Sequence, residues 1–417
     1  MKNKIACVLI GIASLLSCSK NEVISQLPDS AKDSNTIQPH DALSSLEEML
    51  GEVGTKSSAG LSADDLFVIG KRDLSAGTKS SESIDIPDTL LYALNFKDGG
   101  FALMAANTKI NSPVLCITEA GTIGYENIHD AMKFLEETKS DGTKADEHTG
   151  DEVFVDAGQT YVYSLLLSSA ITDYYDNESL AKYSPLTKDS GVKKYGPYLK
   201  TKWTQGKPFN TLTPGNYDAG CVVIAVAQIM AYNERPASCE FITPSIPWNL
   251  HKTVYPYNNI YSMGSENAQF AVALMSIVLG SDDNCAVTYS PSGSGSTANK
   301  ARTTFENYGY NVTKRIGCHA VDKRKIEEQI AAGRPVYMDG SRKTSQGQKG
   351  HAWVIDGRDG DYYHINWGWH GACDGYFYKG TFNTSERAWS DGVYDPGTTF
   401  TEVRDYYHYF NILLYTL

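Results

Sequence analysis

Two polar stretches, residues 136–151 and 183–195, interrupt this chain of 417 residues and limit how it can fold. The first holds almost no side chain that a hydrophobic core could bury, and accessible polar stretches are where domain boundaries and proteolytic cuts concentrate. The chain is also longer than one small domain usually is. We therefore expect a smaller folded unit before these stretches and a larger one after them.

The smaller unit has the pattern of an α+β fold with an antiparallel sheet. Residues 41–53 place apolar side chains at helical spacing, with Asp41 at the expected N-cap. Asp98-Gly99-Gly100 is typical of a hairpin turn between two strands. The short apolar runs that predict strands are 66–69, 90–96, 101–105 and 113–118.

The larger unit begins near residue 195, after a further amphipathic segment at 160–175. Helical patterns come first in this unit and strand patterns follow, which again indicates an α+β fold. The predicted helices are 221–233, 265–279, 297–308 and 322–332, and the predicted strands are 335–338, 352–356, 362–367 and 407–415.

The N-terminus has the pattern of an export signal. Lys2 and Lys4 precede an apolar run, residues 5–16, that is too short to span a bilayer. The run ends in Leu-Leu-Ser-Cys18, which resembles the lipobox of bacterial lipoproteins, in which the cysteine carries the lipid. The alternative is ordinary signal cleavage near Ser17, with Cys18 incidental. The polar residues 19–38 that follow are expected to form a flexible tether.

The net charge of -12 argues against nucleic acid as the main partner, because phosphate binding needs a concentrated basic surface. No Cys-x-x-Cys pair is present, so neither a zinc ribbon nor a redox motif is indicated. We expect no cofactor. A metal site made by His364, His370, Cys373 and Asp374 is a weaker alternative, since no His-x-x-x-His helix supports it.

Cys221 opens an apolar segment without proline that should be a buried helix. A thiol at a helix N-terminus faces free backbone N–H groups, which favour the reactive thiolate and lower its pKa, further so beside a cation. A small buried structural cysteine is the alternative.

A second candidate, His351, follows a glycine-rich polar loop and starts an apolar strand, an edge from which a side chain can reach a cleft. A histidine there can act as a general base, although a structural histidine is the commoner case.

Two more segments carry chemistry. Asn366-Trp367-Gly368-Trp369 could supply an amide that holds an imidazole and an indole that shields it, although both indoles could simply be core. Gln205 lies sixteen residues before Cys221 and could donate to an oxyanion, although glutamine is ordinarily a surface residue.

Together these blocks resemble the streptopain family of bacterial cysteine peptidases, which have a papain-like, two-lobed fold. The resemblance rests on motifs that occur in the same order: Trp203-x-Gln205, Gly220-Cys221-Val222, Gly350-His351-Ala352 and Asn366-Trp367-Gly368-Trp369. Short runs in the first half, such as residues 92–96 and 100–104, resemble the family's inhibitory propeptide.

The resemblance implies a role for each site residue. Cys221 would be the nucleophile and His351 the general base and acid. Gln205 would be an oxyanion donor, Trp367 the shield over the histidine and Asn366 its orienter. The segment after Gly380 fits the family's glycine-rich loop poorly, which leaves the substrate preference open.

We therefore predict a secreted cysteine endopeptidase made as a zymogen, in which the N-terminal unit is an intramolecular inhibitor. It would be a monomer that cleaves proteins or peptides, exported from a bacterial cell and either lipid-anchored or released. A binding lipoprotein that keeps the fold without activity is the alternative. The expected divisions are a signal at 1–18, the tether at 19–38, the propeptide at 39–138, a processing region at 139–194 and the peptidase at 195–417.

Overall fold

The computed structural model describes residues 35–54, 56–75, 86–136, 151–176, 193–238, 245–316, 323–344, 347–382 and 409–417. The predicted signal with Cys18, almost all of the tether, and Cys239 and Cys318 lie outside these ranges. Within them, no helix has the length and apolar character needed to cross a membrane.

One antiparallel sheet runs through both halves of the chain, with its ten strands in the order β1-β2-β3-β4-β9-β8-β7-β6-β10-β5. The strands are β1 (Phe67–Ile69), β2 (Leu91–Asn95), β3 (Phe101–Ala105), β4 (Val114–Thr118), β5 (Asn311–Ile316), β6 (Val336–Thr344), β7 (Gly347–Asp359), β8 (Tyr362–Asn366), β9 (Gly375–Tyr378) and β10 (Tyr409–Thr416). The two halves meet where β4 pairs with β9, with Cys116 opposite Phe377. The two expected units therefore share a sheet.

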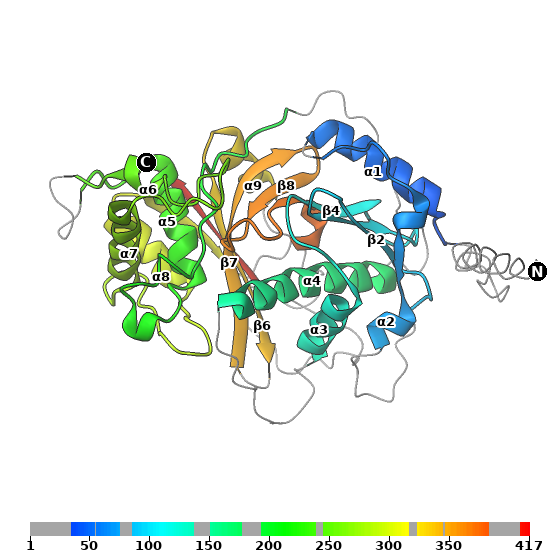
Figure 1. Ribbon diagram of the computed structural model, residues 1–417, viewed down its shortest axis with the longest axis horizontal. Coiled ribbons are helices and arrows are strands. Elements are labelled where there is room, and N and C mark those ends of the chain that lie inside the picture. The colour runs from blue at the N-terminus through cyan, green and yellow to red at the C-terminus, as the bar shows by residue number, and fades with distance from the viewer. Residues whose placement is uncertain are drawn as a thin grey trace, which may run out of the picture.

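The helices gather in groups on this sheet. They are α1 (Pro39–Val53), α2 (Lys71–Ser75), α3 (Tyr125–Glu136), α4 (Asp151–Asp176), α5 (Cys221–Asn233), α6 (Trp248–His251), α7 (Glu266–Gly280), α8 (Ala298–Asn307) and α9 (Lys323–Ala331). In Figure 1, α5 to α8 lie at one end of the molecule, α1 to α3 lie at the other, and α4 runs between them. The α+β class is confirmed.

Helix α1 begins two residues earlier than the sequence pattern indicated. Its N-cap is Gln38, which makes no capping bond with its side chain, and Pro39 occupies the first turn. Proline favours this position because its φ angle is already helical and its missing N–H needs no partner there. The prediction of Asp41 as the cap was wrong, since Asp41 lies inside the first turn.

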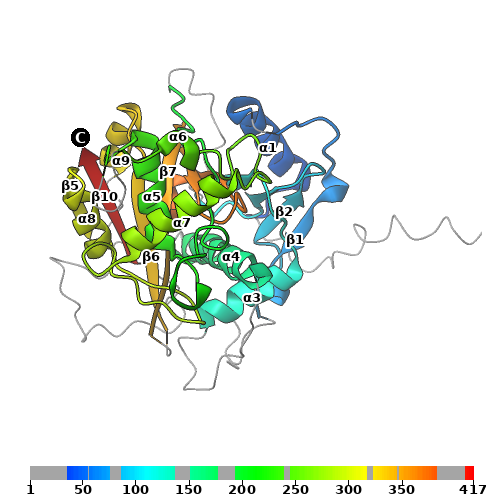
Figure 2. The same ribbon diagram turned by 60° about the vertical axis from the view of Figure 1, so that its left-hand side comes forward.

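Helix α5 is the central helix of the second hydrophobic core. Every residue from 222 to 231 is buried, as expected from its unbroken apolar sequence. Its side chains share this core with Ala352 and Val354 of β7, and Figure 2 shows α5 in front of that strand. The start of α5, where Cys221 lies, is thereby fixed against the sheet.

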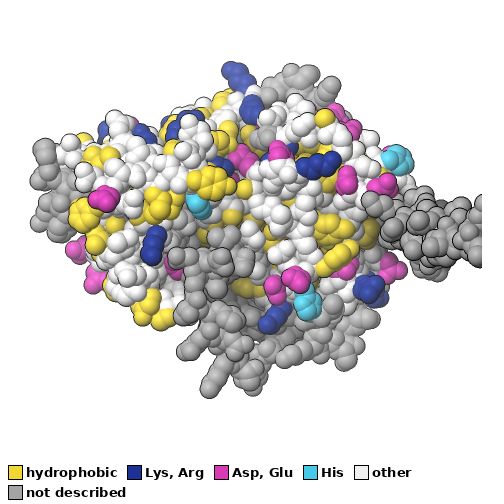
Figure 3. All heavy atoms as spheres, in the orientation of Figure 1, with side chains coloured by type: hydrophobic (Ala, Val, Ile, Leu, Met, Phe, Trp, Pro, Cys, Tyr) yellow, Lys and Arg dark blue, Asp and Glu magenta, His cyan; other side chains and the backbone are white. Residues whose placement is uncertain are grey.

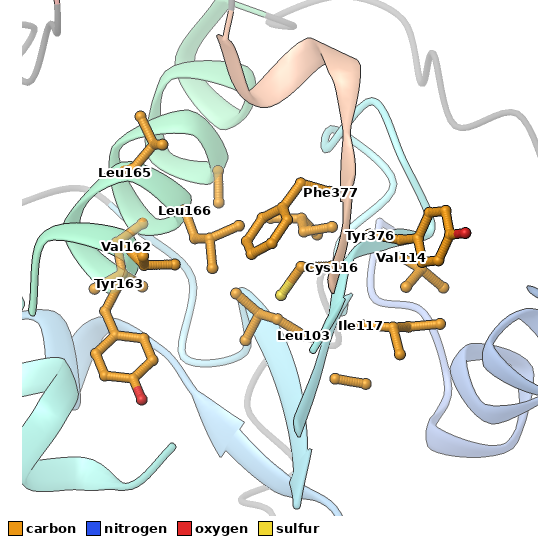
Figure 4. Close-up of a cluster of buried hydrophobic side chains, with 14 of the residues drawn as sticks. Leu103, Val114, Cys116, Ile117, Val162, Tyr163, Leu165, Leu166, Tyr376 and Phe377 are labelled. Carbon is orange, nitrogen blue, oxygen red and sulfur yellow. The ribbon is translucent and has the colours of Figure 1, made fainter. Parts of the chain in front are cut away.

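Helix α4 lies within the range predicted as a processing region and contains the amphipathic segment expected at 160–175. Its residues Val162 and Leu166 are fully buried in the first hydrophobic core, together with Cys116 and Phe377. Figure 4 shows Phe377 and Cys116 pointing from the sheet toward α4, with Tyr376 on the opposite face. Helix α4 therefore covers the junction between β4 and β9.

Candidate active site

Cys221 is the first residue of α5, preceded by Gly220 with a φ angle of 93°. That angle lies in the left-handed region that glycine adopts without strain, so the chain can turn sharply into the helix. The Cys221 thiol is free and partly exposed. Burial raises its pKa to about 11, although hydrogen bonding with the Ala352 backbone acts in the opposite direction. The prediction of a lowered thiol pKa was therefore wrong for this form of the chain, because desolvation outweighs the helix N-terminus.

His351 lies inside β7, opposite Gly340 of β6, rather than at the edge of the strand as predicted. Its Nε2 donates a hydrogen bond to the Trp367 carbonyl oxygen at 2.6 Å. The imidazole is 7% exposed. Burial lowers the His351 pKa to about 3, against the smaller opposite effect of that carbonyl. At neutral pH the ring is therefore uncharged.

Aromatic rings surround the His351 imidazole. Trp369 stacks on it with ring centroids 3.9 Å apart and planes 25° apart. The Trp367 centroid is farther away, at 6.3 Å, as is that of Tyr161 of α4, at 6.0 Å. The nearest ring is thus Trp369, whereas Trp367 contacts the histidine through its backbone. The sequence reasoning gave the shielding role only to Trp367, although Trp369 stands two residues later in the same motif.

Asn366 uses its side-chain amide to join three other segments. Its Nδ2 donates to the Thr201 carbonyl at 3.0 Å, and its Oδ1 accepts from Gln228 Nε2 at 2.9 Å and from the Gly368 N–H at 3.1 Å. These bonds hold α5 and the segment after β8 together. The predicted role of orienting His351 is untested, and the contacts seen here are structural.

A backbone hydrogen bond places Gln205 beside the residues that precede Cys221. Its carbonyl accepts a hydrogen bond from the Ala219 N–H at 2.9 Å, two residues before Cys221. The residue is 5% exposed. The preceding segment is anchored by Trp203, whose indole N–H donates to the Val254 carbonyl at 2.9 Å. This placement suits a donor near the thiol, and the oxyanion role remains a prediction.

The residues of the alternative metal site have other partners in this structure. His364 contacts Asp356 and Glu119, and His370 contacts the Ile260 carbonyl. Across the described ranges, no cluster of three or more histidine, cysteine or acidic side chains is arranged to hold a metal ion.

Comparison with known proteins finds sequence similarity to cysteine peptidases. Residues 203–377 match the Peptidase C10 family. Streptopain of Streptococcus pyogenes is 27% identical over 370 residues, which covers 76% of this chain and 83% of streptopain. The thiol protease/hemagglutinin PrtT of Porphyromonas gingivalis is 30% identical over 205 residues, or 43% of this chain and 23% of that protein.

A solved structure agrees at the level of the fold. A fragment of prointerpain A from Prevotella intermedia superposes with a TM-score of 0.53 at 18% identity, covering 78% of this chain and 94% of the fragment. The chain therefore shares the α+β fold of this prointerpain A fragment across both of its halves. The protein is a cysteine endopeptidase, and residues 203–377 are similar in sequence to the Peptidase C10, or streptopain, family.

Proposed function

We propose that this protein is a zymogen in which Cys221 is the nucleophile and His351 the general base, and that the N-terminal unit together with α4 keeps the pair inactive. The observation that carries the proposal is the state of His351. Its Nε2 is bonded to the Trp367 carbonyl, and its ring is buried beside Tyr161 of α4.

The two proposed reacting groups are both in unreactive forms. The Cys221 thiol is hydrogen-bonded with the backbone of Ala352, the residue that follows His351. A thiol whose pKa is about 11 and an imidazole whose pKa is about 3 are both uncharged at neutral pH. Only the thiolate attacks a carbonyl at a useful rate. The full chain is therefore expected to be latent.

Removal of α4 would reverse the shifts in the pKa values of Cys221 and His351. Water would reach the site, so the His351 pKa would rise and the Cys221 pKa would fall, which favours an ion pair of thiolate and imidazolium. The thiolate would then attack the peptide carbonyl, with the Cys221 N–H and the Gln205 amide binding the oxyanion. His351 would give its proton to the leaving amine, and water would hydrolyse the acyl-enzyme.

Proteins or peptides are the proposed substrates. On the face of Figure 3, basic side chains are scattered among acidic ones, which fits a substrate other than nucleic acid. Export rests on the N-terminal signal pattern, and the lipid anchor on the lipobox-like segment that ends at Cys18. The anchor and the monomeric state remain predictions.

The test is incubation of the chain lacking residues 1–18 under reducing conditions, with chain length and casein hydrolysis followed over time. The parent should shorten and gain activity that thiol reagents abolish, whereas Cys221→Ala and His351→Ala should stay whole and inactive. Cys285→Ala is the control, because Cys285 is also a free cysteine but is fully buried and should be dispensable. Equal activity in Cys221→Ala would exclude the assigned nucleophile, and an inert parent would favour the binding-protein alternative.

A further inference from the structure

Glu119 belongs to the N-terminal unit, but its side chain contacts the peptidase domain. It follows β4 directly, and its carboxylate accepts from three donor side chains that all lie beyond residue 195. Its Oε2 lies 2.6 Å from Lys202 Nζ. Its Oε1 accepts from the Tyr257 hydroxyl at 2.6 Å and from His364 Nε2 at 3.3 Å.

We propose that Lys202, Tyr257 and His364 form a carboxylate-binding site on the peptidase domain, and that Glu119 occupies it while the N-terminal unit is docked. This inference rests on the proposed zymogen function. The site would act as a latch between the inhibitor and the enzyme.

The burial of these groups supports such a site. Lys202 is 6% exposed and His364 is 1% exposed, and charged side chains are rarely buried this deeply unless they are paired. His364 Nδ1 also lies 2.6 Å from Asp356 Oδ1, so both ring nitrogens face carboxylates and both must carry protons. The charged imidazolium of His364 therefore faces a carboxylate at each ring nitrogen, Asp356 at Nδ1 and Glu119 at Nε2.

The latch is connected to the catalytic histidine through Asp374. Lys202 Nζ lies 3.8 Å from Asp374 Oδ2, and Asp374 Oδ1 accepts the Trp367 N–H at 2.9 Å. The carbonyl of the same Trp367 accepts from His351. Lys202, which binds Glu119, is thus linked through Asp374 to Trp367, and Trp367 binds His351.

The backbone reinforces this connection. The Glu119 N–H donates to the Asp374 carbonyl at 2.6 Å, and the Cys373 N–H donates to the Ala120 carbonyl at 3.2 Å. Docking of the N-terminal unit therefore fixes the 373–374 end of residues 367–374 directly, and Asp374 in turn holds the Trp367 N–H at the other end. Losing Glu119 should loosen this segment together with the β4–β9 pairing.

The test uses the full chain with Cys221→Ala, so that its outcome does not depend on peptidase activity. Amide hydrogen exchange is measured in β4 and β9 for Glu119→Gln and for Glu126→Gln, the matched control, whose side chain is exposed on α3. Hydrogen bonds to charged groups contribute ~1.5–3 kcal/mol, so Glu119→Gln should speed exchange at these strands by about tenfold or more. Glu126→Gln should match the parent, and unchanged exchange in Glu119→Gln would overturn the latch.

Tyr257→Phe removes a single hydroxyl from the same site and is the milder probe if Glu119→Gln folds poorly. Once Glu119 is changed, Tyr257→Phe should add little further, because the two side chains act through one contact. Full additivity of the two substitutions would contradict a shared site. In the chain that keeps Cys221, Glu119→Gln should shorten the lag before activation. Faster exchange in Glu119→Gln, combined with a parent chain that never becomes active, would support the latch and reject the proposed function.

Discussion

The imidazole of His351 and the indole of Trp369 lie face to face, with ring centroids 3.9 Å apart. An indole face also attracts a cation, so this stack is compatible with the imidazolium form that catalysis requires. The lowered pKa of His351 comes instead from burial. Trp369 can therefore cover the base in both the latent and the active enzyme, whereas the proposal has Tyr161 of α4 cover it only before activation.

Trp369→Ala should lower kcat/KM of the activated enzyme by about 10²-fold, because the imidazole would lose the surface that fixes its orientation. Greater exposure should also raise the pKa of the His351 imidazolium, which would move the alkaline limb of the pH–rate profile upward. Trp369→Phe should fall between the alanine variant and the parent. Trp248→Phe is the control, since Trp248 packs on His251 at a distance from the site. An unchanged alkaline limb in Trp369→Ala would argue against a shielding role.

Thiol reactivity reports directly on latency. In the full chain, alkylation of Cys221 by iodoacetamide should be slow at pH 7 and should rise about tenfold per pH unit toward the thiol pKa of about 11. Tyr161→Ala should speed the reaction at pH 7 by about tenfold or more, because it opens the cover over the site. Tyr163→Phe on the same helix is the control, as its hydroxyl bonds to the Thr122 carbonyl instead. Peptide mapping by mass spectrometry identifies the labelled cysteine, and equal rates in the full and activated chains would refute burial as the cause.

Local sequence patterns predicted the helices and strands that carry the site. They could not predict which distant segments pair in the fold. The apolar run after Cys221 specified α5, and Asp98-Gly99-Gly100 specified the hairpin between β2 and β3. The pairing of Cys116 with Phe377 had no local signal, because the two strands are far apart in the sequence. Glu119 likewise resembled an ordinary turn residue until the fold placed Lys202 and His364 beside it.

Some misses had a signal that was overlooked. Helix α3 repeats Ile128, Met132 and Leu135 at helical spacing, and all three are fully buried. The pKa of Cys221 was misjudged for another reason: a helix N-terminus can be read from sequence, whereas the depth of burial above it cannot. That burial comes from segments that meet only in the folded chain, such as β7, whose Ala352 backbone contacts the thiol.

Stability should depend on the charge of His364. Its pKa is raised to about 10 because Asp356 and Glu119 outweigh the desolvation, whereas an unfolded histidine titrates near ~6.5. The stabilisation is therefore complete below about pH 6.5 and is lost as the pH rises through about 10. In the Cys221→Ala chain, His364→Gln should lower Tm by several degrees at pH 6.5 and by much less at pH 10. His129→Gln, at an exposed position of α3, should follow the parent. A constant difference between His364→Gln and the parent across this pH range would contradict the charged form.

The position of the activating cut follows from the position of α4. A cut in residues 137–150 would leave Tyr161 joined to the peptidase domain, whereas a cut in residues 177–192 would separate them. A site for a sequence-specific protease can be inserted in either segment of the otherwise unchanged chain. We expect the second cut to raise casein hydrolysis and labelling of Cys221 by about 10²-fold, and the first to leave both near the uncut level, because His351 would stay covered. Each variant without added protease controls for self-cleavage. Equal activation by both cuts would show that the N-terminal strands and α1 to α3, rather than α4, hold the enzyme latent.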